Sequence, residues 1–335
     1  MSFLKSLSIK KLFALQRATE MMRLTKSELK KSIFVYTPPK VGSTSIVSSM
    51  RTFMGHKFNV IHIHDERMLE TFTGIKGISV MELINYTKHK LNHDVYVIDV
   101  YRNPIERKMS VFFEKITTFH FNTTPQKLAD YPIQKLIHRF NCLFPHLGKD
   151  DWFLDKFNIP IPNTFDTTNK YIKIIHNGIC YIKLRLCDSI HWSEILSSIF
   201  KINIKIISDY EGKKKEISHI YDQFKREYKI PANLLVSLKN QLDIKYFLSS
   251  SEFDIYFSAW KGKSTHEYIP FNELQYDVYL QISKENQIQA DSVQHMHYRD
   301  EGCRCQKCTL ERQQMIRKIL AGKFQGNETV WHQIK

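Results

Sequence analysis

The feature that most constrains the fold is a repeated order of short apolar run, polar loop and helix-like segment. Runs rich in β-branched and aromatic residues stand at 33–36, 60–63, 95–101 and 181–186. Each is short and bounded by polar residues, proline or both, as in a buried strand. Apolar positions at helical spacing follow the loops. This alternation predicts βαβ units, and therefore an α/β fold with a parallel sheet flanked by helices.

The same pattern divides the chain into three parts. Residues 1–31 read as a basic amphipathic helix, and residues 32–262 as the α/β domain. Within that domain we expect a further strand at 204–207 and a helical second half over 213–248. Residues 263–335 are more polar and read as a C-terminal extension.

A formal net charge of +15 predicts a surface that attracts anions. No basic tract interleaved with aromatic residues stands out, so no specific nucleic-acid partner is expected. No apolar run approaches the roughly 20 residues of a membrane span, and the N-terminal segment is too interrupted for a secretory signal. The N-terminal helix either docks on its own domain or lies on an anionic membrane. We therefore expect a cytoplasmic protein, with peripheral membrane contact as the alternative.

The loop after the first strand has the composition of an anion site. The stretch 36–45 reads YTPPKVGSTS, with a glycine that permits close backbone approach just before a helix opens. Free N–H groups and the positive end of the helix dipole favour a phosphate there. A helix capped by a Ser or Thr side chain is the alternative interpretation. The candidate ligands are Lys40, Gly42, Ser43, Thr44 and Ser45.

This loop differs from the Walker A motif of nucleoside triphosphatases. Lys40 precedes Gly42, and no Gly-Lys-Ser/Thr sequence follows. No pair of acidic residues that would hold Mg²⁺ stands beside the loop. These departures argue against kinase or ATPase chemistry.

A second candidate anion loop follows the 95–101 strand. Arg102 leaves the strand end, and Arg107 and Ser110 lie on one face of the helix that Pro104 opens. Arginine binds phosphate bidentately, and serine adds a donor. Alternatively, Arg102 caps carbonyl groups and Arg107 pairs with a nearby glutamate at the surface.

Taken together, the two loops resemble the nucleotide site of sulfotransferases. More narrowly, the chain resembles the bacterial capsular polysaccharide synthesis family, which is sulfotransferase-like, over residues 33 to 260. Each motif is short, and their order and spacing carry the resemblance. The matching motifs are KVGSTSI at 40–46, RNPIERKMSVFFE at 102–114, DWF at 151–153, FD at 165–166 and YIKLRLCDS at 181–189.

The resemblance implies the P-loop-like sulfotransferase fold and the donor 3′-phosphoadenosine-5′-phosphosulfate. It assigns the 5′-phosphosulfate to the loop from Lys40 to Ser45, and the 3′-phosphate to Arg102 and Ser110. The implied acceptor is a hydroxyl group of a carbohydrate or another molecule. Asn103 stands where an aspartate is common, and Cys187 where an acidic residue is expected before Asp188.

Sulfuryl transfer needs a group that stabilises the departing oxygen and a base for the acceptor hydroxyl. Lys40 suits the first role. His64, just after the second strand, is the preferred base because histidine titrates near neutrality. His62 is the second choice, and Asp65 and Glu66 remain open.

A cluster near the C-terminus has the composition of a zinc site. Imidazole and thiolate ligands at such short spacing can hold a structural zinc ion, while reduced, exposed thiols are the alternative. The cluster comprises His295, His297, Cys303, Cys305 and Cys308.

Two other functions compete with sulfuryl transfer. One is a different nucleotide-dependent enzyme, such as a phosphotransferase that needs Mg²⁺. The other is a non-enzymatic module that binds nucleic acid or an acidic polymer through its positive surface, with a strong dependence on salt.

Overall fold

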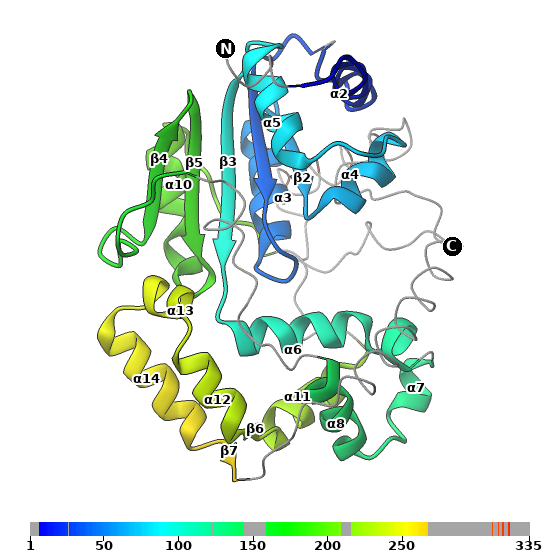
Figure 1. Ribbon diagram of the computed structural model, residues 1–335, viewed down its shortest axis with the longest axis vertical. Helices are drawn as coiled ribbons and strands as arrows, with labels where there is room; N and C mark the ends of the chain where they lie inside the picture. The colour runs from blue at the N-terminus through cyan, green and yellow to red at the C-terminus, as the bar shows by residue number, and fades with distance from the viewer. Residues whose placement is uncertain are drawn as a thin grey trace.

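A mostly parallel five-stranded sheet forms the centre of the protein, as described by a computed structural model. The described residues are 7–25, 27–121, 123–143, 159–208 and 216–266, with single positions at 310, 314, 317 and 321. The strands are β1 (Lys31–Tyr36), β2 (Asn59–Ile63), β3 (Asp94–Tyr101), β4 (Tyr171–His176) and β5 (Ile179–Arg185). Their order across the sheet is β2-β1-β3-β5-β4, and β4 is antiparallel to β5 while the others are parallel (Figure 1).

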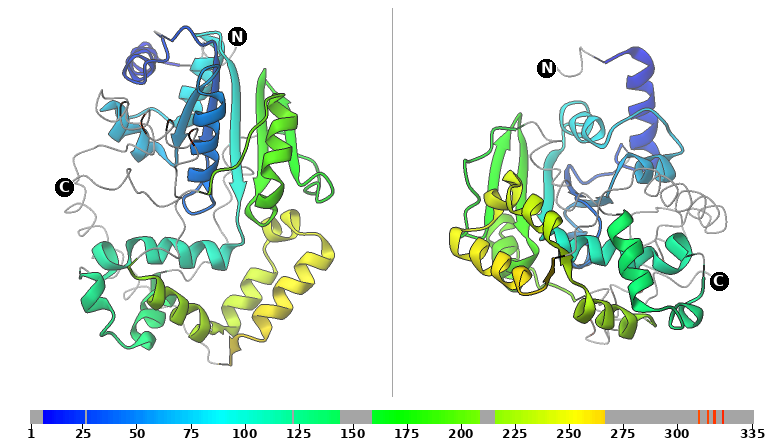
Figure 2. Two further views of the ribbon diagram at one scale, coloured as in Figure 1. Left: turned by 180° about the vertical axis from the view of Figure 1, so that it is seen from behind. Right: turned by 60° about the horizontal axis from the view of Figure 1, so that its bottom comes forward.

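Helices cover both faces of this sheet, so the domain has the expected α/β architecture with three layers. On one face, Leu15, Leu83 and Val97 belong to one buried cluster, and on the other Ile46, Ile98 and Leu196 belong to a second. Figure 2, left, shows the second face with its two helices in front of the strands. The helices of the first face are α2 (Ile9–Met21), α4 (Glu66–Thr73) and α5 (Val80–His89); those of the second are α3 (Ser43–Met54) and α10 (Trp192–Phe200).

A helical region lies beyond the carboxyl end of β3 and has its own aromatic core around Phe112, Phe224 and Tyr228. Figure 1 shows α6 crossing beneath the strands, with α11, α12 and α14 on its far side. The helices of this region are α6 (Pro104–Lys115), η1 (Ile116–Phe121, a π-helix), α7 (Pro125–Leu128), α8 (Ile133–Leu143), α11 (Ser218–Glu227), α12 (Ala232–Lys239), α13 (Leu242–Phe247) and α14 (Ser250–Lys261). The remaining elements are a 3₁₀-helix η2 (Leu186–His191) and the short strands β6 (Ile230–Pro231) and β7 (Ser264–Thr265).

The strand order creates a topological switch point between β1 and β3. From β1 the chain goes to β2 on one side, then returns across β1 to β3 on the other side. Loops that leave two such strands diverge, and ligands of open α/β sheets bind in the crevice between them. Both candidate anion loops leave the sheet at this point, one from β1 and the other from β3.

The prediction of a strand at 204–207 is wrong, because the structure has no strand there. Backbone N–H groups of this segment bond to serine hydroxyls rather than to a strand: Ile204 to Ser197 at 2.8 Å, and Ile207 to Ser49 at 2.9 Å. Ile204 is nevertheless buried against the α3 and α10 layer. The apolar alternation therefore reflects burial along two helices, not pairing in the sheet.

The N-terminal helix packs on its own domain. The α2 helix contacts α4 and α5, and Lys11 forms an ion pair with Glu82 at 2.5 Å. Among the described residues, no helix is long and apolar enough to cross a membrane. Most of the expected extension at 263–335 lies outside the described residues.

Candidate functional site

The loop between β1 and α3 has an unusual backbone. Lys40 has φ +67° and Gly42 has φ +88°, so two residues in the turn adopt the left-handed region. A lysine in this region is uncommon, and such outliers concentrate at binding sites. Helix α3 begins at Ser43, as expected, and its N-cap Gly42 makes no side-chain cap. The first N–H groups of the helix therefore face a position suited to an anion.

Gly42 is required by crowding as well as by its backbone angle. A Cβ atom there would lie 2.9 Å from Leu186 Cδ1 and 3.1 Å from the Trp192 ring. Leu186 opens the η2 helix that follows β5, so the end of a third strand supports the anion loop.

We expect Gly42→Ala to destabilise the fold more than Gly77→Ala. Both glycines have positive φ, which costs an alanine about 1 to 2 kcal/mol, but Gly77 has open space around its Cβ position. Overpacking should add at least about 1 kcal/mol at Gly42. Urea unfolding of the two variants measures the difference, and equal losses would contradict the crowding argument.

Hydrogen bonds join the two candidate loops directly. Thr37 Oγ1 accepts from Val100 N at 3.0 Å, which links the ends of β1 and β3. Arg102 Nη1 donates to the Lys40 carbonyl at 2.7 Å, as expected from the alternative in which Arg102 caps a carbonyl group, and this bond links the loops beyond the two strands. Residues about sixty positions apart in sequence thus form one structural unit.

One face of α6 runs along this unit. Glu106, Ser110 and Glu114 follow one another at intervals of four residues and so share a helical face. Lys40 Nζ forms an ion pair with Glu114 Oε2 at 3.0 Å, which shows that this face turns toward the anion loop. Ser110 is half-buried on that face, between the two glutamates.

The surroundings of Arg102 come largely from the helical region. Burial lowers the pKa of its guanidinium, and Tyr221 and Glu106 oppose that shift. Glu106 is itself held by Tyr256 Oη and Trp260 Nε1, which donate to its carboxylate at 3.0 and 3.1 Å. Burial raises the pKa of Glu106 despite these donors. Tyr221 of α11 and Glu106 of α6, the latter held by α14, therefore form part of the surroundings of Arg102.

His64 lies at the end of β2, next to the anion loop. Its Nδ1 is 2.7 Å from the Thr37 carbonyl, so Nδ1 carries the proton and donates it to that oxygen. In this tautomer Nε2 is the basic nitrogen. The side chain is half-buried, and a hydrogen bond to the β1 end sets its orientation.

His62 occupies a different environment. Its side chain is 1% exposed, and its ring lies 4.5 Å from the His64 ring, edge to face. Among the described residues neither of its ring nitrogens has a hydrogen-bond partner. Burial, then the nearby His64 and Arg51, hold the pKa of His62 well below its usual value. The imidazole is therefore neutral and shielded behind His64.

We expect this burial to appear in the pH dependence of stability. Below about pH 6.5 the unfolded chain protonates His62 while the folded chain does not, so stability is lost as pH falls, by up to about 1.4 kcal/mol per pH unit. His62→Gln should remove this contribution, and the exposed His56→Gln should not. Urea unfolding at pH 7.5 and 5.5 compares them. Parallel profiles for wild type and His62→Gln would contradict the assignment.

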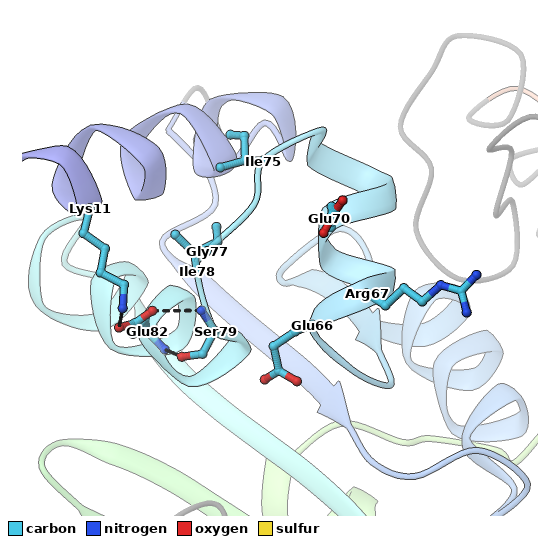
Figure 3. A pocket seen from close by; sticks show the side chains of 9 residues that line it. All are labelled: Lys11, Glu66, Arg67, Glu70, Ile75, Gly77, Ile78, Ser79 and Glu82. Atoms are coloured by element: carbon cyan, nitrogen blue, oxygen red, sulfur yellow. Dashed lines mark hydrogen bonds and ion pairs between the residues drawn. The ribbon is translucent and has the colours of Figure 1, made fainter. Parts of the chain in front are cut away.

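The two carboxylates beside His64 have structural contacts. Asp65 caps α4 by accepting from Met68 N at 2.8 Å. Glu66 accepts from Tyr36 Oη at 3.3 Å, and it also lines a cavity of about 450 Å³ between α2, α4 and α5 (Figure 3). Figure 3 shows Glu66 beside the end of β1 and charged groups of both signs around the cavity. The cavity walls are formed by Lys11, Glu66, Arg67, Glu70, Ile75, Gly77, Ile78, Ser79 and Glu82.

Of the remaining sequence motifs, some lie within the described residues and others lie outside them. Asp166 accepts local bonds from Asn169 and Thr168 in a turn, and Asp188 accepts from the buried Arg185 at 2.6 Å. The DWF motif at 151–153 lies outside the described residues. The Cys/His cluster, His295, His297, Cys303, Cys305 and Cys308, lies outside them too.

Five of the predicted site residues lie together at the carboxyl ends of the parallel strands. They are Lys40, Gly42, Ser43, Arg102 and His64. Sequence reasoning did not assign Glu106 or Tyr221 to the site, nor Glu114 as the partner of Lys40. The spacing of the glutamates from Ser110 was a usable signal, whereas nothing in the sequence placed α11 beside Arg102. None of the family models, curated proteins and solved structures compared with this chain matches it.

Proposed function

We propose that this protein is a sulfotransferase that uses 3′-phosphoadenosine-5′-phosphosulfate and adopts the P-loop-like sulfotransferase fold. The observation that carries the proposal is the hydrogen bond from Arg102 to the Lys40 carbonyl at the switch point. It couples two anion loops from two strands, and a nucleotide with phosphates at both ends needs two such sites. The motifs at 40–46 and 102–114 also resemble those of the capsular polysaccharide synthesis family, which is sulfotransferase-like.

Each end of the donor has suitable protein groups in this proposal. The 5′-phosphosulfate binds the start of α3, where Gly42 admits it and Ser43, Thr44 and Ser45 supply donors. Arg102 and Ser110 bind the 3′-phosphate. Tyr221 and Glu106 keep the Arg102 guanidinium in place.

The reaction requires one bond to form and one to break. The acceptor hydroxyl oxygen attacks sulfur, and the bond between sulfur and the bridging phosphate oxygen breaks. The hydroxyl proton passes to His64 Nε2, the basic nitrogen in the tautomer set by Thr37. Lys40 stabilises the charge on the departing phosphate. His62, buried behind His64, serves better as its packing partner than as the base.

The acceptor in this proposal is a hydroxyl of a carbohydrate or a similar molecule. The cavity beside Glu66 combines charged and polar groups with the apolar side chains of Ile75 and Ile78, a mixture that suits the hydroxyl groups and the apolar ring faces of a sugar. Helix α4 begins two residues after His64.

Thermal shift with three ligands separates this proposal from its rivals. We expect 3′-phosphoadenosine-5′-phosphate to raise the melting temperature without metal, and ATP with Mg²⁺ to raise it less. Stabilisation by ATP with Mg²⁺, and none by 3′-phosphoadenosine-5′-phosphate, would indicate a phosphotransferase. Stabilisation by an RNA oligomer alone, falling steeply with salt, would indicate a polyanion-binding module.

Glu114 offers a further test of the Lys40 assignment. In the structure Lys40 pairs with Glu114, and a bound phosphosulfate must compete with this carboxylate. We expect Glu114→Gln to tighten nucleotide binding several-fold while changing stability by less than about 1 kcal/mol, because the ion pair is partly exposed. Calorimetry and urea unfolding measure the two quantities. Weaker binding would show that Glu114 supports Lys40 rather than competing for it.

A further inference from the structure

The outer face of helix α2 exposes an unusual number of large apolar side chains. Ile9, Phe13 and Met21 are 73%, 67% and 54% exposed. They belong to a helix of 13 residues that already buries its other face, with Leu15 and Ala18, against the domain. Exposed apolar groups gathered on one element are typical of an interaction surface.

Basic side chains are interleaved with these apolar groups. Lys10 and Arg17 are exposed on the same side of α2, and Arg23 is exposed just beyond its end. The one carboxylate on this side, Glu20, accepts a hydrogen bond from Gln16 at 3.1 Å. Positive charge therefore prevails on this face, which we call the α2 outer face.

Figures 1 and 2 place α2 at the periphery of the protein. Lys11, on the inward side, is fixed by its ion pair with Glu82. The helix is thus already folded and oriented, so binding through its outer face requires no unfolding of the domain.

We propose that the α2 outer face docks on an anionic lipid surface. An interfacial helix of this kind inserts its apolar side chains among the acyl chains, while its basic groups meet anionic headgroups. A second copy of this chain fits less well, because its charge of +15 and its basic α2 face would repel an identical surface. This inference does not depend on the proposed sulfuryl transfer.

Vesicle sedimentation tests the proposal directly. The wild-type protein should sediment with vesicles of phosphatidylcholine and phosphatidylglycerol, should not do so with phosphatidylcholine alone, and should be released by salt. The double variant Ile9→Ser, Phe13→Ser should bind at least about tenfold more weakly. The charge variant Lys10→Glu, Arg17→Glu should lose the preference for anionic lipid. Because all four positions are exposed, unfolding temperatures should stay unchanged.

A matched control removes apolar groups elsewhere. Ile175 and Ile190 are 72% and 84% exposed on other elements, so Ile175→Ser, Ile190→Ser should bind vesicles as wild type does. Three results would overturn the proposal. They are no binding of the wild type to anionic vesicles, equal loss in the control, or a wild-type dimer that Ile9→Ser, Phe13→Ser converts to a monomer without lipid.

Discussion

Arg102→Ala is expected to weaken binding of 3′-phosphoadenosine-5′-phosphate by about tenfold to a hundredfold. The guanidinium is the proposed ligand of the 3′-phosphate, and a charge-assisted hydrogen bond contributes about 1.5 to 3 kcal/mol. The variant also loses the bond to the Lys40 carbonyl. Titration calorimetry measures the dissociation constant.

Two further variants show whether the lost affinity reflects overall charge or the geometry of the Arg102 guanidinium. Arg226 is exposed on α11, so Arg226→Ala removes the same charge without touching the site and should change affinity little. Arg102→Lys keeps the charge and loses the planar fork, so it should recover only part of the affinity. A full loss in Arg226→Ala would mean that overall charge, rather than the site, governs binding.

Lys183→Met is expected to destabilise the fold by about 3 to 5 kcal/mol. Lys183 Nζ and Asp99 Oδ2 form an ion pair at 2.6 Å between β5 and β3, and both side chains are fully buried. Removing the ammonium leaves the Asp99 carboxylate buried without its cation, which is among the costliest single changes in a protein. Urea unfolding monitored by circular dichroism measures the loss.

The double variant separates the stability that the ion pair contributes from the destabilisation caused by an unpaired buried charge. Lys183→Met with Asp99→Leu removes both charges, and apolar replacement of a buried pair is often neutral or stabilising. We therefore expect the double variant to recover most of the lost stability. If it is as unstable as Lys183→Met alone, the pair itself contributes strongly to the folded state.

Much of the sheet could be predicted from local patterns. The strands that became β1, β2, β3 and β5 contain near-continuous apolar runs, because strands buried on both faces are mostly apolar. The buried polar residues His62, Asp99 and Lys183 interrupt them. The start of α3 at Ser43 followed from the glycine and the hydroxyl residues before an apolar helical pattern. These are local consequences of burial and of the turn at Gly42.

The antiparallel edge strand β4 was missed although a local signal existed. Asn177 and Gly178 both have positive φ and connect β4 to β5 in a tight turn, for which Asn-Gly is the preferred sequence. The β4 residues alternate in exposure, as an edge strand does, so no continuous apolar run marked them. At 204–207 the opposite error arose, because apolar residues packed along helices resemble a strand.

The candidate site also contains a part that local sequence predicts and a part that depends on the tertiary fold. Lys40 and Arg102 were predictable because each belongs to a local loop with its own composition. The contacts that join them, Arg102 to the Lys40 carbonyl and Lys40 to Glu114, span 62 and 74 residues and depend on the sheet order. The role of Tyr221 depends on how α11 packs against α6, which no local pattern encodes.

The most direct test of the two-ended nucleotide site compares three ligands in two proteins by calorimetry. In the wild type, 3′-phosphoadenosine-5′-phosphate should bind more tightly than adenosine 5′-phosphate or adenosine 3′-phosphate. In Arg102→Ala the advantage of the 3′-phosphate should disappear, while adenosine 5′-phosphate should retain most of its wild-type affinity. Equal affinity of the wild type for the bisphosphate and for adenosine 5′-phosphate would contradict the account.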